Sequence, residues 1–308
     1  MAREYGDNAH HLASAPVVVG VDGSAAADSA LTWAAEVARQ RGRELRIVHG
    51  LDLNGMRDVF GRYDVWVPPV LDTVRSEGEA IVQRAEHQVR AAAHELGVST
   101  EVSDESPAEL LLRHSATAYL VVLGASGTSG LLAHMGSILL SVISHAEGAV
   151  VVVRTDPDAD NGVRSDGPVV VGVDGSPVSE NALAAAFEEA SQRRAELVAM
   201  HAWNDLNIGR FAADPYLLFP VNEIETDERA ALAERLAGWQ EKFPDVPVRR
   251  EVGPAAPATE LLHWSKTAQL VVVGSRGRGG FRSLLLGSTS NSLVQHAHCP
   301  VMVVHPAK

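Results

Sequence analysis

The sequence predicts an α/β fold made of two tandem, doubly wound domains, each built around a five-stranded parallel sheet. Three observations support this prediction. The chain has 308 residues, which is enough for two domains of ordinary size. The segment VVVGVDGS occurs twice, at residues 17–24 and 169–176. In both halves short apolar runs alternate with amphipathic stretches, as expected of alternating strands and helices.

The repeat continues through each half of the chain. Further matching segments follow in the same order at offsets of 150 to 152 residues: 47–49 with 199–201, 120–124 with 270–274, 136–137 with 287–288, and 149–153 with 300–304. Ordered matches of this kind indicate duplication. We therefore assign residues 16–154 to a first copy and 168–308 to a second. An acidic linker at 155–167 joins them, and a polar tail at 1–15 is predicted to be disordered.

The elements are clearest in the second copy. We expect strands at residues 168–174, 196–202, 247–252, 269–274 and 300–304, and helices at 178–194, 223–243, 256–267 and 287–297. Apart from 247–252, the strand runs are mostly apolar, which is typical of a parallel sheet covered by helices on both faces. The first copy follows the same plan. Both copies have an irregular stretch after the second strand, at 52–72 and 204–222, predicted to form flaps or contact surfaces with its aromatic residues Phe60, Tyr63, Trp66, Phe211, Tyr216 and Phe219.

Composition excludes several classes of protein. The formal net charge of −13 argues against a nucleic-acid-binding surface. No apolar run approaches the roughly 20 residues of a membrane helix, and no signal peptide is visible. Cys299 is the single cysteine, which excludes an intramolecular disulfide and is typical of a cytoplasmic protein. His296 and His298 lie beside it, but three such ligands at a helix–strand junction rarely converge on one ion, so we expect no metal site.

The loop after the fourth strand of the second copy is a candidate phosphate-binding site. Residues 274–288 read GSRGRGGFRSLLLGS and lead from a buried strand into a helix. The glycines allow tight turns and let backbone N–H groups approach an anion. Hydroxyls at the helix start and positive charge on the loop would add to this, from Ser288, Thr289, Ser290, Arg276, Arg278 and Arg282. The alternative is a surface loop capped by Ser288, but its position after a buried strand favours phosphate binding.

Asp174 ends the first strand of the second copy, at the edge of the sheet where ligands bind in open α/β folds. Its carboxylate either accepts a hydrogen bond from an adenine amine or ribose hydroxyl, or simply forms a turn before a helix capped by Ser176. The sequence leaves both interpretations open. Asp205 is a weaker candidate for the ribose. His49 and His201 end the second strands, and we interpret them as packed side chains rather than general bases.

Several other signatures are missing from the sequence. There is no G-x-x-x-x-G-K-[ST] motif, which disfavours a P-loop NTPase. No G-x-G-x-x-G motif follows either first strand, and no G-x-S-x-G motif is found, so neither a dinucleotide-binding domain nor an α/β-hydrolase is expected.

Taken together, VVVGVDGS, the histidine ending the second strand, Gly274-x2-Gly277-x9-Gly287-Ser288 and Cys299-Pro300-Val301 resemble the universal stress protein family, in its tandem two-domain actinobacterial type. The resemblance covers residues 16–305. It implies a Rossmann-like, adenine nucleotide α-hydrolase-like fold that usually binds ATP, and Mg²⁺ is a further candidate ligand. It further implies a role in stress response, dormancy or growth control, a regulatory protein partner, and a homodimer formed partly through the last strand. Some members of the family bind cyclic AMP, and some bind no nucleotide.

The resemblance also assigns residues to the site. In the second copy it gives Gly172 and Asp174 to the base and ribose, and Ala202 and Asp205 to the region after the second strand. The phosphate loop and helix start are Val273, Gly274, Ser275, Arg276, Gly277, Arg278, Gly279, Gly280, Gly287, Ser288, Thr289 and Ser290. The matching positions of the first copy are Gly20, Asp22, Gly124, Gly127, Gly130, Gly136 and Ser137.

The first copy departs from this pattern. Only eight residues separate Gly127 from Gly136, its loop carries no arginine, and Ser-Ile-Leu replaces Ser-Thr-Ser at the helix start. A charge-assisted contact to phosphate contributes about 1.5–3 kcal/mol. Losing two such contacts would weaken binding by orders of magnitude at ~1.4 kcal/mol per tenfold. The hypothesis is that the first copy binds ATP weakly or is mainly structural.

Three functions follow from the sequence. The first is a regulatory protein whose conformation or partner choice depends on ATP. The second is an enzyme, either a slow ATPase or an adenylate-transferring relative, although the H-x-G-H and S-G-G-x-D-S motifs common in such relatives are missing. The third is an interaction scaffold with a vestigial nucleotide pocket.

Overall fold

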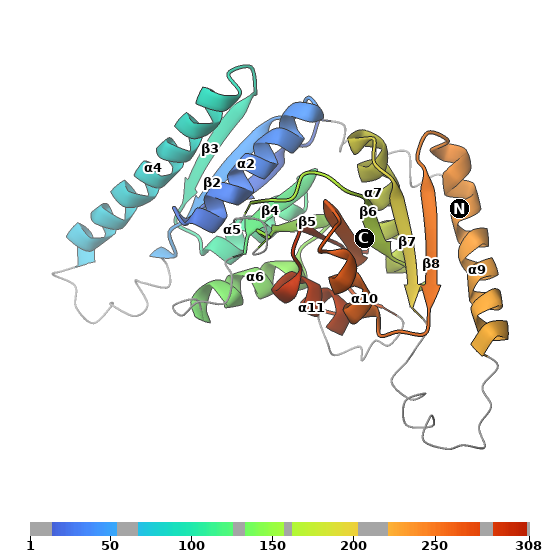
Figure 1. Ribbon diagram of the computed structural model, residues 1–308. Helices are drawn as coiled ribbons and strands as arrows, with labels where there is room; N and C mark the ends of the chain where they lie inside the picture. The colour runs from blue at the N-terminus through green and yellow to red at the C-terminus, as the bar shows by residue number, and fades with distance from the viewer. Residues whose placement is uncertain are drawn as a thin grey trace. The chain divides into compact units, whose positions relative to one another are not determined.

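The computed structural model describes residues 14–53, 67–125, 133–156, 162–202, 221–277 and 286–306. The chain divides into two compact units, Met1–Arg154 and Thr155–Lys308, here unit 1 and unit 2, which contain the first and second copies (Figure 1). Some of the predicted site residues lie outside the described residues: Asp205, Arg278, Gly279, Gly280, Arg282, Gly127 and Gly130. The same is true of the six aromatic residues of the predicted flaps.

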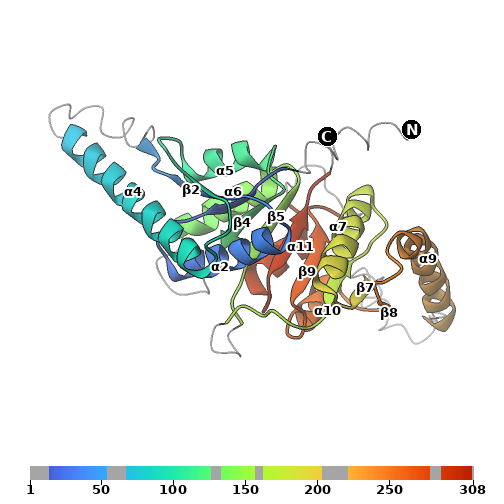
Figure 2. The same cartoon turned by 90° about the horizontal axis from the view of Figure 1, so that it is seen from above.

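Unit 1 is a parallel sheet covered on both faces. Its strands, β1 (Val17–Gly20), β2 (Leu45–Gly50), β3 (Val98–Ser103), β4 (Leu120–Gly124) and β5 (Ala149–Val153), lie in the order β3-β2-β1-β4-β5. Its helices are α2 (Ala25–Gln40), α4 (Val67–Ala92), α5 (Pro107–Ser115) and α6 (Ala133–His145). Helices α2 and α4 cover one face of the sheet, and α5 and α6 cover the other (Figure 2).

Unit 2 repeats this arrangement. Its strands, β6 (Val169–Gly172), β7 (Leu197–Ala202), β8 (Val248–Gly253), β9 (Leu270–Gly274) and β10 (Val301–Val304), lie in the order β8-β7-β6-β9-β10. Its helices are α7 (Pro177–Arg193), α9 (Val221–Lys242), α10 (Pro257–Trp264) and α11 (Ser288–His296). The predicted fold class is confirmed: each unit contains a doubly wound, five-stranded parallel sheet.

The cores follow from the strand sequences. Val17, Val18 and Val19 are fully buried in β1, as are Val169, Val170 and Val171 in β6. Branched side chains of this kind pack well on both faces of a pleated sheet, which explains why the runs do not alternate with polar residues. The helices that follow these strands begin in the same way. The Ser24 and Ser176 hydroxyls accept hydrogen bonds from the N–H groups of Ala27 and Ser179, 3.2 Å away in each unit.

One prediction about helix boundaries was wrong. The stretch at about 52–72 was expected to be irregular, but α4 begins within it, at Val67. The helix expected near residue 223 begins at Val221, close to the prediction. The start of α4 includes Pro68 and Pro69. Both prolines fall in the first helical turn, where N–H groups have no partner within the helix and proline is tolerated.

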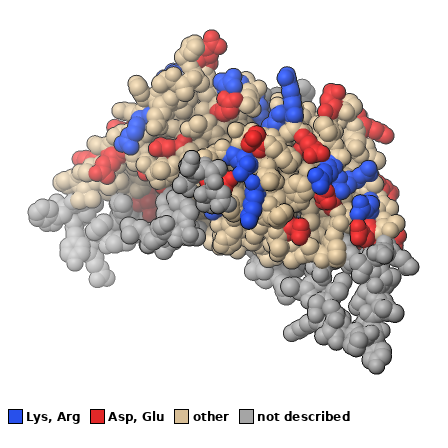
Figure 3. Space-filling model, viewed as in Figure 1, with Lys and Arg blue, Asp and Glu red and all other residues tan. Residues whose placement is uncertain are grey.

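The described surface is of mixed charge. On the face seen in Figure 3, acidic and basic side chains are intermingled. Within the described ranges, no helix combines the length and apolar character needed to cross a membrane.

Candidate functional site

The topology gives each unit one point where a ligand is expected to bind, here called its crevice. From β6 the chain passes outward to β7 and β8, then returns to β9 on the other side of β6. The strand order therefore reverses between β6 and β9, and ligands of open parallel sheets bind at such a point, beyond the carboxyl ends of the strands. In unit 1 the equivalent point lies between β1 and β4.

Asp174 follows β6 and lies at this crevice. Its Oδ1 accepts a hydrogen bond from the Ser176 N–H at 2.9 Å, and its own N–H donates to the Ser179 hydroxyl at 3.1 Å. The turn allowed by the sequence is therefore present. The Asp174 Oδ2 lies beside the loop that follows β9, since a β-carbon placed on Gly277 would be 2.6 Å from it. Two segments about 100 residues apart in sequence thus meet at the edge of the sheet.

The end of β9 and the start of α11 are fastened together. The Ser290 hydroxyl donates to the Gly274 carbonyl at 2.7 Å, and the Gly287 N–H donates to the Ser275 carbonyl at 2.8 Å. A side chain at Gly274 would collide with α7, since a β-carbon there would lie 2.9 Å from Val178 Cγ1. These contacts hold the N-terminus of α11 next to the loop that carries Arg276 and Gly277.

The start of α11 leaves several polar groups available. Its N-cap is Gly287, which has no side chain to satisfy the N–H groups of the first turn. Ser288 is exposed and Thr289 is partly exposed, whereas Ser290 is buried and its hydroxyl is already used. Arg276 is exposed. The Ser275 hydroxyl is buried and finds no hydrogen-bond partner among the described residues. Of the three hydroxyls predicted to bind phosphate, Ser290 instead positions the helix.

Gly172 has a packing role that sequence reasoning did not identify. A β-carbon there would lie 3.0 Å from Leu261 Cδ1 and 3.3 Å from Val273 Cγ1, so a side chain would require these neighbours on α10 and β9 to shift. Gly20 is in the same situation in unit 1, 3.0 Å from Leu123 Cδ2 and 3.2 Å from Leu111 Cδ2. Ala202 is the last residue of β7, where it pairs with Gly253 and is partly buried.

The histidines that end the second strands are packed side chains, as predicted. His201 is 7% exposed; its Nδ1 donates to the Val173 carbonyl at 2.6 Å, and its Nε2 lies 3.0 Å from Glu228 Oε2 on α9. His49 Nδ1 donates to the Val21 carbonyl at 2.7 Å. In place of a glutamate, α4 presents Gly78 to the His49 ring.

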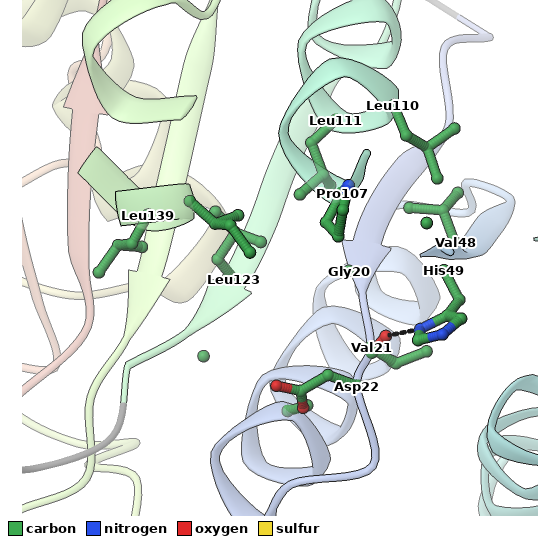
Figure 4. Close-up of a pocket in the computed structure, with 14 residues that line it drawn as sticks. Gly20, Val21, Asp22, Val48, His49, Pro107, Leu110, Leu111, Leu123 and Leu139 are labelled. Carbon is green, nitrogen blue, oxygen red and sulfur yellow. Dashed lines mark hydrogen bonds between the residues drawn. The ribbon is translucent and has the colours of Figure 1, made fainter. Parts of the chain in front are cut away.

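Unit 1 has a cavity of about 100 Å³ at its crevice (Figure 4). Its lining is largely aliphatic and comes from all the elements that meet there: Gly20, Val21, Asp22, Ala27, Val48, His49, Gly50, Pro107, Leu110, Leu111, Leu123, Gly124, Ile138 and Leu139. Asp22 forms the same turn as its counterpart, accepting from the Ser24 N–H at 2.9 Å.

Four lining positions differ in polarity between the copies. Ala27, Leu110, Ile138 and Leu139 of unit 1 correspond to Ser179, Glu260, Thr289 and Ser290 of unit 2. Sequence comparison detected the last two differences. It missed the differences at Ala27 and Leu110, which become visible only when the starts of α2 and α5 are matched with those of α7 and α10.

The helix start predicted in unit 1 was wrong. Gly136 and Ser137 were expected to open a helix as Gly287 and Ser288 do, but α6 begins at Ala133. The N–H groups of Gly136 and Ser137 therefore lie beyond the first turn, where hydrogen bonds within the helix use them. At Gly124, close packing against α2 accounts for the glycine, since a β-carbon would be 2.2 Å from the Ala26 carbonyl oxygen.

Across the described residues, no group of three or more His, Cys, Asp or Glu side chains is arranged to hold a metal ion. His298 and the buried Cys299 have other neighbours. The His298 ring lies 3.4 Å from the buried Asp156 carboxylate, and the Cys299 thiol lies 3.5 Å from the Pro300 carbonyl.

Comparisons with known proteins agree with this architecture. Residues 14–154 and 167–305 each match the family model described as "Universal stress protein family". A universal stress protein of Mycolicibacterium smegmatis is 42% identical over 295 residues, which cover 94% of this chain and 97% of the relative. One of Mycobacterium tuberculosis H37Rv is 42% identical over 296 residues, covering 93% and 96%.

A solved structure shares the fold. The crystal structure of a universal stress protein from Archaeoglobus fulgidus superposes with a TM-score of 0.69 at 17% identity, covering 97% of this chain and 99% of that one.

Proposed function

The chain belongs to the universal stress protein family, and we propose that unit 2 binds ATP while unit 1 does not. The observation that carries the proposal is the meeting of Asp174 with the Gly277 loop beside the N-terminus of α11. A carboxylate able to accept hydrogen bonds from a sugar and a helix start suited to a phosphate thus both lie next to the loop that carries Arg276 and Gly277.

Electrostatics supports the orientation of the nucleotide. The unsatisfied N–H groups and the dipole of α11 favour negative charge at its N-terminus. The Ser288 and Thr289 hydroxyls and the Arg276 guanidinium would add hydrogen bonds to phosphate oxygens. The Asp174 carboxylate would repel phosphate, so in the proposed orientation the ribose or base of the nucleotide lies next to Asp174. ATP bound in this way would use Mg²⁺ to screen its phosphates from the many acidic residues of the chain.

The site supports binding better than turnover. Both ring nitrogens of His201, near the end of β7, already have partners, which disfavours a role as general base. We therefore propose a regulatory role, in which ATP occupancy changes how a protein partner binds. A cytoplasmic location and a homodimer belong to the same proposal, and sedimentation with and without ATP tests the assembly.

The test is to count the ATP sites and locate them. Mass spectrometry of ligand released from freshly purified chain should detect an adenine nucleotide, and calorimetry of nucleotide-free chain should give one tight site. Asp174→Ala should weaken binding about tenfold or more, because a hydrogen bond to a charged group contributes about 1.5–3 kcal/mol. The matched variant Asp22→Ala should bind ATP like the wild type. Two equal sites, or a loss caused by Asp22→Ala alone, would contradict the proposal.

A further inference from the structure

We propose that the crevice of unit 1 is a binding site for a compact, uncharged, apolar molecule with a body of about six carbons. This inference concerns a different site from that of ATP in unit 2 and does not depend on it. It rests on the lining of the unit 1 cavity, on the charges around it and on its size.

The walls of the cavity are aliphatic and come from separate elements. Leu110 and Leu111 enter from α5, Leu123 from β4, and Ile138 and Leu139 from α6 (Figure 4). Leu110, Leu111 and Leu123 are at most 7% exposed, so the surrounding core holds them in place. A preformed apolar surface of this kind binds apolar ligands without first having to reorganise.

The polar side chains of the lining disfavour an anion. Among the described residues they are Asp22 and His49, and none of the described lining residues is a lysine or an arginine. The Nδ1 of His49 donates to the Val21 carbonyl, and the Asp22 carboxylate keeps one oxygen on the Ser24 N–H. A carboxylate or phosphate entering this space would meet the negative charge of Asp22 with no cation from the lining to compensate. Unit 2 has the opposite arrangement, with Arg276 and an uncapped helix start beside its crevice.

The lining of unit 1 has not only lost the polar groups that could contact a nucleotide but has aliphatic side chains in their place. Where unit 2 carries two serines, a threonine and a glutamate, unit 1 carries alanine, isoleucine and two leucines, and all four face the same cavity. A partly exposed position that had only lost its nucleotide contacts would not need an apolar side chain. An apolar side chain contributes to stability when it is removed from water. A molecule that covers Ile138 and Leu139, which are only partly buried, supplies that gain.

The size of the cavity sets the size of the ligand. It has a volume of about 100 Å³ and is bounded by Leu, Ile and Val side chains. An engineered, enclosed cavity of about 150 Å³ with a similar lining binds benzene. The unit 1 cavity is of similar scale but opens to solvent, so it takes up the apolar part of a small molecule, such as a chain of about six carbons whose end protrudes.

The experiment compares hexan-1-ol with hexanoate, which share a chain length and differ in charge. Each is titrated into the full chain while the methyl signals of Leu, Ile and Val are followed by NMR. Hexan-1-ol should give saturable shifts at Leu123 and Leu139, and hexanoate should bind at least tenfold more weakly. The Asp22→Asn variant should narrow that difference, because it removes the negative charge without changing the shape of the side chain.

Two neighbouring leucines provide the matched variants. Leu139→Ser introduces the residue found at the equivalent position of unit 2 and should weaken hexan-1-ol binding at least tenfold. Leu140, on the same helix, is 38% exposed and does not line the cavity, so Leu140→Ser should leave binding unchanged. Both changes lie at partly exposed positions, where a folded protein is retained.

Several results would overturn the inference: no saturable shifts with hexan-1-ol, equal affinity for hexanoate, equal effects of Leu139→Ser and Leu140→Ser, or displacement of hexan-1-ol from unit 1 by ATP. ATP binding to unit 2 is measured separately through Asp174→Ala. If one of the two proposals fails, the experiment on the other can therefore still be interpreted.

Discussion

The two crevices lie at the same point of the same topology and offer opposite chemistry. In unit 2 a loop with an exposed arginine and a helix start without a side-chain cap meet the carboxylate of Asp174. In unit 1 the helix begins earlier, at Ala133, and aliphatic side chains fill the positions of the hydroxyls. The same backbone plan thus carries different chemistry, which a few positions near the starts of three helices of unit 2 determine.

The comparison also shows which shared feature is structural. Asp22 and Asp174 accept hydrogen bonds from the N–H of the serine two residues later, at 2.9 Å in both units. This turn is needed to begin α2 and α7 whether or not a ligand binds. An aspartate after the first strand is therefore weak evidence for a nucleotide by itself. The evidence in unit 2 comes from the loop that lies against it.

The largest expected effect comes from filling the contact between that loop and Asp174. A side chain at Gly277 would meet Asp174 Oδ2, which Oδ1 holds in place through its hydrogen bond to Ser176. We expect Gly277→Val to weaken ATP binding by about 100-fold or more, or ~2.7 kcal/mol. Calorimetry measures the loss, and circular dichroism checks the fold. Gly97→Val is the control, because a β-carbon there meets nothing within 4 Å. Unchanged affinity for ATP in Gly277→Val would remove the loop from the site.

The next effect concerns the helices that cover the second strands. Alanine normally stabilises a helix relative to glycine by about 1 kcal/mol. At Gly78 of α4, however, a β-carbon would lie 2.5 Å from Leu51 Cδ2 and 2.9 Å from His49 Cδ2. Overpacking of this kind costs about 1–3 kcal/mol, so Gly78→Ala should lower the free energy of unfolding of unit 1.

Gly238 of α9, on the corresponding helix of unit 2, serves as the control, since a β-carbon there meets no atom within 4 Å. Gly238→Ala should raise stability by about 0.5–1 kcal/mol. Urea denaturation of the two variants measures both changes. If both variants changed the free energy of unfolding in the same direction, α4 could shift away from His49. The close packing of unit 1 would then not be specific.

A smaller effect tests the charge of the unit 2 crevice. Arg276→Ala should weaken ATP binding about tenfold, or ~1.4 kcal/mol, because it removes one charge-assisted contact to phosphate. Binding of adenosine, which has no phosphate, should be unchanged, and the dependence of ATP affinity on salt should become shallower. Arg249→Ala is the control, because that exposed arginine pairs with Glu251 on β8. Equal losses for ATP and adenosine would show that Arg276 supports the fold of the loop and does not contact phosphate.

Much of the fold was predictable from the sequence because its signals are local and repeated. Fully buried parallel strands read as apolar runs, and the duplication confirmed each run with a second instance. The errors fell at two helix starts. Helix α4 begins at Val67, where two prolines fit the first turn, and α6 begins at Ala133, whereas analogy with Gly287 had placed its start at Gly136. The sequence around residues 133–137 contains no strong capping signal, so nothing local marks where α6 begins.

The site was predictable only in part, because its residues come from distant segments. The Gly-rich loop and Asp174 are recognisable as motifs, whereas the contact between Gly277 and Asp174 depends on how the strands are ordered. The packing role of Gly172 depends on Leu261, which lies on another helix. Leu110 and Ala27 escaped notice in the same way, since neither belongs to a motif and only the fold brings them to the cavity.

The smallest effect concerns an ionic network on β3 and α5 of unit 1. Arg113 Nη2 lies 2.6 Å from Glu101 Oε1, and His114 Nε2 lies 2.8 Å from Glu101 Oε2. Burial raises the pKa of Glu101, but the hydrogen bonds from Arg113 and His114 outweigh it, so the pKa lies below its ordinary value of 4.5. In unit 2 the positions of Arg113 and His114 are His263 and Trp264, and the same network cannot form.

A lowered pKa stabilises the folded state above the ordinary value, and this contribution disappears as the pH falls through the folded-state pKa. Unit 1 should therefore lose stability below about pH 4.5 through Glu101, by less than about 1 kcal/mol because the pair is partly exposed to solvent. Glu101→Gln should flatten this part of the pH dependence in urea denaturation. Arg113→Ala should flatten it too, and the double variant should add little. Additive effects of the two changes would mean that Glu101 and Arg113 act independently.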